Sequence, residues 1–216
     1  MKKFMHTVVA VLVTLSFMQF VGSANAAPKS KVKEEVKAAE VPGSGFKPFG
    51  VYSDQGAKGN HYIPSGWMGD YGDLKLNPGN TDKPHSGNTC IKITYNAKMA
   101  QNAGWAGIYW QYPANNWGEK KGGFNLVGAS KLTFWARGDK GGERIAEFKV
   151  GGITGEYPDS DSQSIGPVEL TTEWQKFTID LKGKDLSNII GGFCWTASKD
   201  DNPDGFVIFL DDIMYE

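Results

Sequence analysis

The sequence has few of the residues that redox, metal-dependent or nucleophilic catalysis requires. It contains only three histidines and two cysteines among 216 residues. The two histidines beyond the N-terminal region, His61 and His85, are not spaced as metal ligands. No phosphate-binding loop, dinucleotide fingerprint or nucleophile elbow is present. These absences argue against nucleotide-dependent chemistry and against the common hydrolytic triads.

The sequence also lacks an excess of charge of either sign. The formal net charge is −1, and no stripe of basic residues occurs. Proteins that bind nucleic acid usually carry such a basic patch. We therefore expect no nucleic-acid partner.

Only one long apolar run occurs, and it lies at the N-terminus. Lys2 and Lys3 precede the run "TVVAVLVTLSFMQFV", and small residues ending in Ala24-Asn25-Ala26 follow it. This order predicts a cleaved signal peptide over 1–26, because the run is short for a membrane span. An uncleaved membrane anchor is the alternative. We expect an exported protein, periplasmic or extracellular, that does not insert into the membrane after cleavage.

The segments after the predicted cleavage site differ in composition. Residues 27–45 are rich in Lys, Glu, Ala and Pro and end in Gly-Ser-Gly, which predicts a flexible charged leader. Residues 46–216 are enough for one well-filled domain. In an exported chain, Cys90 and Cys194 could form a disulfide. Two buried free thiols are the alternative.

Hydrophobic periodicity predicts an all-β domain. Apolar and polar residues alternate along 89–95, 131–137, 145–150 and 174–181, and the C-terminal 205–216 is apolar on both faces. Residues 105–112 are expected to form a further strand. Clusters of Gly, Pro, Asn and Asp separate these segments, as turns do. No segment longer than ten residues has helical periodicity. The pattern favours a β-sandwich.

Three motifs resemble a known family. In order, they are "KLTFWARGDKGGERIAEFKVGG", "PVELTTEWQKFTIDLKG" and "FVIFLDDIMYE". They are similar to the jelly-roll carbohydrate-binding modules with a galactose-binding-like fold, over roughly residues 86–216. The resemblance implies a non-catalytic protein that recognises a poly- or oligosaccharide on an aromatic-lined concave face. Some proteins of this fold do not bind sugars.

Five of the fifteen residues in "GWAGIYWQYPANNWG" (104–118) are Trp or Tyr. In a strand, Trp110 and Tyr112 share one face with Ile108, whereas Tyr109 and Gln111 share the other. One face of a sandwich strand lies in the core, so one ring set is structural, and Trp110 and Tyr112 are the better candidates for core packing. Rings not needed for the core can stack on the apolar faces of sugars.

Other segments supply further candidates for sugar contact. Trp67 and Tyr71 are expected in one Gly-rich loop and Tyr157 in another, while Glu147 and Lys149 lie on the polar face of their strand. The resemblance places that face in the groove, and the amides of Gln111, Asn115 and Asn116 would add hydrogen bonds. The complete set of predicted carbohydrate-binding residues is Trp67, Tyr71, Tyr109, Trp110, Gln111, Tyr112, Trp117, Glu147, Lys149 and Tyr157.

The two adjacent carboxylates of the C-terminal segment also require explanation. Asp211 lies among apolar neighbours and needs a cation or hydrogen-bond donors. The resemblance implies a structural calcium ion with Asp211 as one ligand and Asp54 as another. Calcium takes six to eight oxygens, many from the backbone. The alternative is that Asp211 accepts hydrogen bonds from nearby backbone N–H groups.

Two other function classes stay open. A glycoside hydrolase or polysaccharide lyase would need paired carboxylates, and Glu147, Glu156, Asp159 and Asp161 are the available ones. No tight acidic motif on one strand marks a pair among them. Alternatively, the same sandwich could bind a separate enzyme or an envelope protein as its partner.

Overall fold

The computed structural model describes residues 45–216. The predicted signal peptide and all but the last residue of the predicted leader lie outside the described residues. Within 45–216, no helix is long and apolar enough to cross a membrane. The one helical segment of this part is the short 3₁₀ helix η1 (Tyr71–Asp73).

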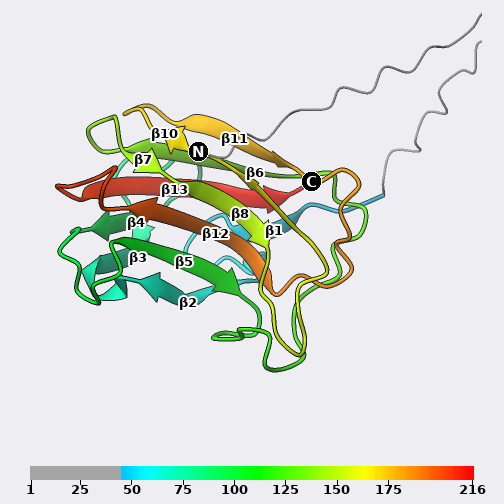
Figure 1. The fold of residues 1–216 in the computed structure, drawn as a ribbon. Coiled ribbons are helices and arrows are strands. Elements are labelled where there is room, and N and C mark those ends of the chain that lie inside the picture. Colours follow the sequence, from blue (N-terminus) through cyan, green and yellow to red (C-terminus); the bar gives the residue numbers. More distant parts are fainter. Residues whose placement is uncertain (1–44) are drawn as a thin grey trace, which may run out of the picture. The chain divides into compact units, whose positions relative to one another are not determined.

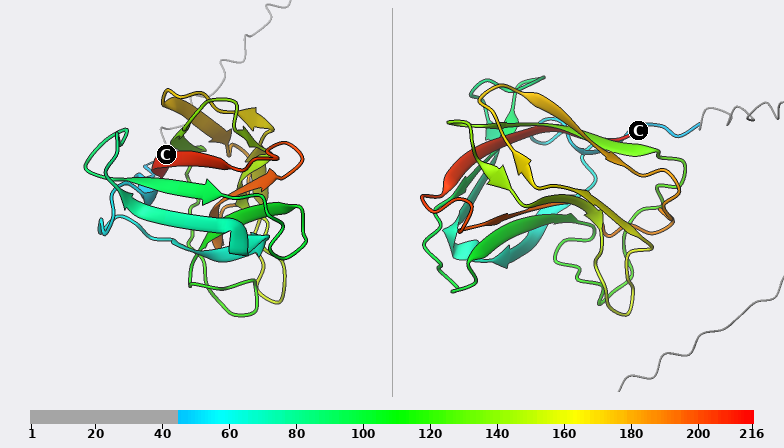
Figure 2. Two further views of the ribbon diagram at one scale, coloured as in Figure 1. Left: turned by 90° about the vertical axis from the view of Figure 1, so that its left-hand side faces the viewer. Right: turned by 45° about the horizontal axis from the view of Figure 1, so that its top comes forward.

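The described chain forms two antiparallel sheets that pack as a sandwich, which confirms the predicted all-β jelly roll (Figures 1 and 2). The six-stranded sheet contains β11 (Gln175–Asp180), β6 (Lys131–Gly138), β13 (Phe206–Tyr215), β4 (Cys90–Tyr95) and β3 (Leu74–Asn80) in that order, with β1 (Phe49–Tyr52) also paired to β13. The five-stranded sheet has the order β2 (Ile63–Gly69), β5 (Trp105–Gln111), β12 (Gly191–Ser198), β8 (Glu147–Gly151) and β9 (Ser162–Ile165). The two-residue strands β7 (Arg144–Ile145) and β10 (Val168–Glu169) pair separately.

The structure confirms the six strands predicted from the sequence, which are β4, β5, β6, β8, β11 and β13. It corrects one segment that was predicted as a loop. Residues 63–69 form the strand β2, at the edge of the five-stranded sheet. Pro64 and Gly66 flank an irregularity in its pairing with β5. Edge strands and bulges tolerate such residues, which is why the segment did not have the composition of a strand.

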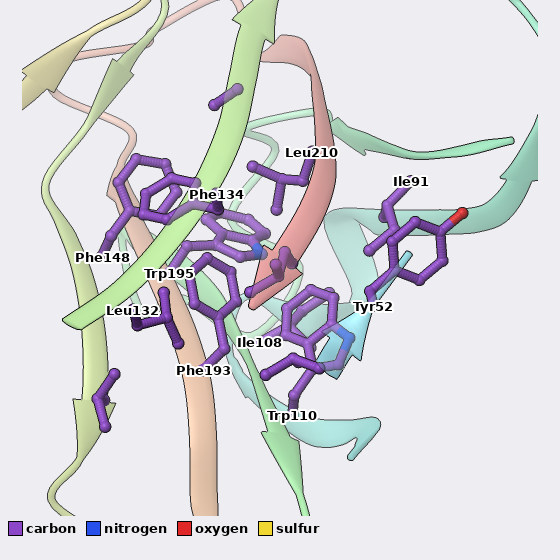
Figure 3. Packing of buried hydrophobic residues seen from close by; sticks show 14 of the residues in the cluster. Tyr52, Ile91, Ile108, Trp110, Leu132, Phe134, Phe148, Phe193, Trp195 and Leu210 are labelled. Atoms are coloured by element: carbon purple, nitrogen blue, oxygen red, sulfur yellow. The ribbon is translucent and has the colours of Figure 1, made fainter. Parts of the chain in front are cut away.

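The core lies between the sheets and is rich in aromatic rings (Figure 3). Phe193 of β12 lies 5.1 Å from Phe134, 5.5 Å from Trp110 and 5.9 Å from Phe148, measured between ring centroids. Phe134 comes from the six-stranded sheet and the other three from the five-stranded sheet. These rings therefore join the two layers and fix their separation.

Cys90 and Cys194 are both free and buried, so the structure has the alternative of two buried thiols and not the possible disulfide. Cys90 precedes the core residue Ile91 and faces the outer side of the six-stranded sheet. Cys194 lies between the core residues Phe193 and Trp195 and faces the outer side of the other sheet. Packed sheets are about 10 Å apart. The two thiols thus lie on opposite faces of the sandwich, beyond the reach of one S–S bond.

Removing the ring that joins the layers should destabilise the fold strongly. Phe193 is completely buried, so we expect Phe193→Ala to lower the free energy of unfolding by about 3–5 kcal/mol. The control is Val127→Ala, since Val127 is 63% exposed and its truncation should change stability by less than about 0.5 kcal/mol. Urea denaturation measures both. Similar losses for the two variants would contradict the assignment of Phe193 to the core.

Candidate functional site

Alternation along β5 gives the five-stranded sheet a core face and an outer face. Ala106, Ile108 and Trp110 are buried in the core between the sheets. The alternate residues of the strand point to the outer face. They are Trp105, Gly107, Tyr109 and Gln111. The register between β5 and β12 is regular from Trp105 to Trp110, so the alternation holds along this length.

Strand register places side chains of the five strands in two rows on this outer face. One row is Met68, Gly107, Thr196 and Glu147, and the other is Gly66, Tyr109, Cys194, Lys149 and Ser164. The first row contributes a hydroxyl and a carboxylate, and the second an ammonium and a hydroxyl. The polar side chains of this face, which we call the polar floor, come from β12, β8 and β9, whereas Met68, Tyr109 and Cys194 form an apolar cluster beside them.

Two long loops form a wall at one end of this face. They are 112–124, after β5, and 152–161, after β8, and Figure 1 shows them together beyond the ends of these strands. The Tyr157 N–H donates to the Gly118 carbonyl at 2.8 Å. A Cβ at position 118 would lie 1.9 Å from the Thr154 carbonyl oxygen. Gly118 also has a φ of +86°, so both the space and the backbone conformation require glycine there.

Asp159 holds the wall to the sheet. Its carboxylate accepts hydrogen bonds from the backbone N–H groups of Ile153, Ile190 and Gly191. Burial nevertheless raises the pKa of this carboxyl above its ordinary value, because desolvation disfavours the charged form more than the three donors favour it. Asp161 accepts bonds from the N–H groups of Ser162 and Asp185 and from the Lys184 ammonium. Both carboxylates thus have a structural role in this loop.

Gln111 and Asn116 form hydrogen bonds inside the wall. This corrects their prediction as sugar contacts. Gln111 is completely buried; its Nε2 donates to the Asn116 carbonyl at 3.0 Å, and its Oε1 accepts from the Ser65 hydroxyl at 2.9 Å. The Asn116 side chain donates to the Lys120 carbonyl and accepts from the Gly118 N–H. Neither amide points to the surface. Asn115 is exposed beside them.

Tyr109 and Trp117 meet where the wall joins the sheet. Their ring centroids are 5.9 Å apart with an interplanar angle of 87°. The Tyr109 hydroxyl donates to the Gly151 carbonyl at 2.9 Å, and burial raises the pKa of this phenol. Tyr109 is 7% exposed, whereas Trp117 is 39% exposed. Tyr109 therefore supports Trp117, and Trp117 presents the accessible ring.

Trp105 is the site residue that sequence reasoning missed. It lies on the same strand face as Gly107 and Tyr109 and is 39% exposed. Four residues of strand separate it from Tyr109, which corresponds to about 13 Å. The outer face is therefore flanked by two accessible indoles, Trp105 and Trp117, with the polar floor beside them. The sequence contained a signal for this placement. Trp105, Gly107 and Tyr109 are spaced two residues apart, and residues two apart in a strand share a face.

The structure places four of the predicted aromatic residues away from this face. Trp110 is 1% exposed and belongs to the core, so its prediction as a sugar contact is wrong. Trp67 pairs with Ile108 and faces the opposite side of β2 from Met68. Tyr112 stacks on Phe124 with ring centroids 4.4 Å apart, and Tyr71 lies exposed in η1.

Glu147 and Lys149 both face the outer side of β8, as predicted. Within residues 45–216 neither forms a salt bridge; the three ion pairs of this part use other side chains. Both are partly exposed. An unpaired carboxylate and an unpaired ammonium can respectively accept from and donate to hydroxyl groups of a ligand.

The outer face of the six-stranded sheet is closed by contrast. The His85 ring stacks on Trp135 at 3.8 Å between centroids. Trp174 Nε1 donates to the Lys83 carbonyl at 3.0 Å. The Arg137 guanidinium lies 3.7 Å from the centre of the Phe209 ring. A segment around residues 83–85 thus covers the aromatic residues of this face.

Asp211 and Asp54 fix the same covering segment. Asp211 accepts from the N–H groups of His85, Ser86 and Asp212, while Asp54 accepts from those of Asn88 and Thr89. No three acidic, His or Cys side chains converge on a metal position within 45–216. A calcium ion at Asp211 would therefore take most of its ligands from backbone carbonyl oxygens. The calcium site stays a prediction.

Two carbohydrate-binding modules are among the solved structures that share this fold. One is a family 30 carbohydrate-binding module, with a TM-score of 0.56 and 18% identity over 81% of this chain and 89% of that one. The other is the family 30 module of the cellulosomal cellulase Cel9D-Cel44B of Clostridium thermocellum, with a TM-score of 0.54 and 17% identity over 79% and 97%. No protein-family model and no curated protein matches the sequence. The likeness confirms, at the level of the fold, the resemblance indicated by the three motifs.

The role of Asp159 gives a test with a defined sign. Because its pKa is raised by folding, the part of the stability that depends on its protonation is fully present below the unfolded value of about 3.9 and is lost as the pH rises through the folded value. Its hydrogen bonds to the three backbone N–H groups are a separate contribution that persists at pH 7. Asp159→Asn removes this titration and weakens the bonds to three N–H groups. We expect a loss of about 1–3 kcal/mol at pH 7 and a flatter dependence of stability on pH above about 4.

Glu156→Gln is the matched control for this variant, because Glu156 is exposed in the same loop. Its stability and pH profile, measured by urea denaturation from pH 4 to 8, should resemble those of the wild type. If Asp159→Asn shows the control's profile, then Asp159 does not anchor the wall.

Proposed function

We propose that this protein binds a poly- or oligosaccharide on the outer face of the five-stranded sheet and does not cleave it. The observation that carries the proposal is the pair of accessible indoles, Trp105 and Trp117, beside the polar floor. An indole has a broad apolar face for the C–H side of a sugar ring. Thr196 on the neighbouring strand β12, and Glu147 and Lys149 on β8 beyond it, supply hydrogen-bonding groups beside the two rings.

The spacing favours a chain of several sugars as the ligand. About 13 Å separates Trp105 from the position of Tyr109, on which Trp117 leans. One sugar ring cannot stack on both indoles at contact distance. An oligosaccharide laid along β5 could reach both and turn its hydroxyls toward the floor on the neighbouring strands.

The closed outer face of the other sheet and the structural likeness support the same choice. Both of the family 30 structures compared above are described as carbohydrate-binding modules. The candidate carboxylates Asp159 and Asp161 are engaged by backbone N–H groups, which favours binding over hydrolysis. Export to the periplasm or the exterior, as the N-terminal sequence predicts, would place the protein where polysaccharides occur.

Three matched variants test the assignment of the face. Trp105→Ala and Trp117→Ala should each weaken retention on a bound polysaccharide at least about tenfold, since buried aromatic anchors often contribute more than 1 kcal/mol to binding. Trp67→Ala is the control, because Trp67 is 37% exposed but lies on the other face of β2. Its binding should stay within about twofold of the wild type.

The measurement is affinity electrophoresis and calorimetry of residues 27–216 against a panel of soluble and insoluble polysaccharides, with product analysis. Loss of binding in Trp67→Ala alone would place the site on the side of β2 that carries Trp67, and not on the outer face of the sheet. Release of soluble products that disappears in Glu147→Gln would show an enzyme instead. Retention on no polysaccharide would reject the proposed function.

A structural calcium ion is a separate part of the proposal. If Asp211 and Asp54 help to hold calcium, then millimolar calcium should raise the melting temperature relative to EDTA, because a ligand of the folded state stabilises it. Asp211→Asn should abolish the difference. Identical melting curves in calcium and EDTA would reject a structural calcium ion at Asp211 and Asp54.

A further inference from the structure

A small cavity opens at the edge of the sandwich formed by β2 and β3. It has a volume of about 130 Å³ and is separate from the outer face described above. Its apolar lining comes from both sheets and from β1 and its flanking residues: Val51, Tyr52, Tyr62, Pro64, Leu76, Pro78, Ile91 and Trp110. The exposed residues Gln55 and Gly56, with Asn60, form its mouth.

Most polar groups around the cavity are already paired. The Tyr52 hydroxyl donates to the Pro78 carbonyl at 2.5 Å, and the Tyr62 hydroxyl donates to the Ile189 carbonyl at 2.9 Å. The Asn60 side chain accepts from the Ser53 N–H and donates to the Asp54 carbonyl. These groups shape the wall of the cavity but have little left to offer to a ligand.

The Trp110 indole N–H is the exception. No residue in 45–216 accepts a hydrogen bond from it, and Figure 3 shows the ring nitrogen turned toward Tyr52 and Ile91, which also line the cavity. The cavity thus combines an apolar interior with one inward donor. This combination fits an apolar ring that carries a single acceptor oxygen.

The volume limits the ligand to one small ring. An apolar protein cavity of about 150 Å³ is known to bind benzene, and this cavity is only slightly smaller. We propose that it is a second binding site, specific for a single phenol-like aromatic ring whose oxygen accepts from Trp110 Nε1. The proposal does not depend on sugar binding at the outer face.

A sugar ring fits the same cavity poorly. Its several hydroxyls would lose their hydration, whereas the interior of the cavity offers one free donor and the Gln55 amide lies only at the exposed mouth. Each unpaired buried hydroxyl costs about 1–3 kcal/mol. A phenol loses water from one hydroxyl and regains one hydrogen bond. The chemistry of the lining therefore selects aromatic over saccharide rings.

The test uses NMR of protein labelled with ¹⁵N at its seven tryptophans and phenol as the probe. Phenol should cause a saturable shift of the Trp110 indole signal, which is identified as the one missing in Trp110→Phe. Benzene should bind several-fold more weakly, since it lacks the acceptor, and glucose should leave the signal unchanged. A phenol titration with no saturable shift of Trp110 would overturn the proposal.

Two variants locate the phenol within the protein. Leu76→Phe fills the cavity from a partly buried position and should raise the phenol Kd at least tenfold. Val51→Ile adds one methyl group and should raise it less. Val127→Phe is the control, because Val127 is exposed and lies outside the cavity, and it should bind like the wild type. Unchanged affinity in a folded Leu76→Phe variant, confirmed by its circular dichroism, would place the phenol elsewhere and reject the site.

Discussion

The packing of this protein and its candidate binding face both depend on β5, whose one face fills the core while the other faces outward. Ile108 and Trp110 fill the core from β5, while Trp105 and Tyr109 of the same strand face outward. A shift of the register by a single residue would exchange the two sets. The regular pairing of β5 with β12 therefore fixes both the packing of the sandwich and the identity of the side chains offered to a ligand.

The wall depends on polar groups buried inside it. The Gln111 amide donates to the Asn116 carbonyl and accepts from the Ser65 hydroxyl, while the Asp159 carboxylate accepts from backbone N–H groups. Because these bonds are shielded from water, losing one partner leaves the other unsatisfied, which costs more than an exposed bond is worth. The same bonds hold the segment that carries Trp117 against Tyr109. Binding geometry and local stability are thus linked in this part of the chain.

Period-two alternation predicted the strands well, because strands with one buried face must alternate. It correctly separated Ile108 and Trp110 from Tyr109 and Gln111. It failed at β2, where Pro64 and Gly66 gave the composition of a loop although an edge strand tolerates both.

The prediction of the site was less complete, since local sequence does not show tertiary partners. The Gln111 amide could hydrogen-bond to a sugar, but only the fold shows that this amide is already bonded to Asn116 and Ser65. Trp67 is as exposed as Trp117 yet lies on the wrong face of its strand. Trp105 was recognisable by its spacing from Gly107 and Tyr109. The sequence left the disulfide open because cysteine content does not tell on which face of the sandwich each thiol lies.

The central claim is that the outer face of the five-stranded sheet is the carbohydrate site. The most direct measurement is the ¹⁵N spectrum of the tryptophan indoles during titration with an oligosaccharide derived from a retained polysaccharide. The account predicts that the signals of Trp105 and Trp117 shift together with one affinity, while those of Trp67, Trp135 and Trp174 stay in place. A shift confined to Trp67, or to the covered pair Trp135 and Trp174, would contradict it.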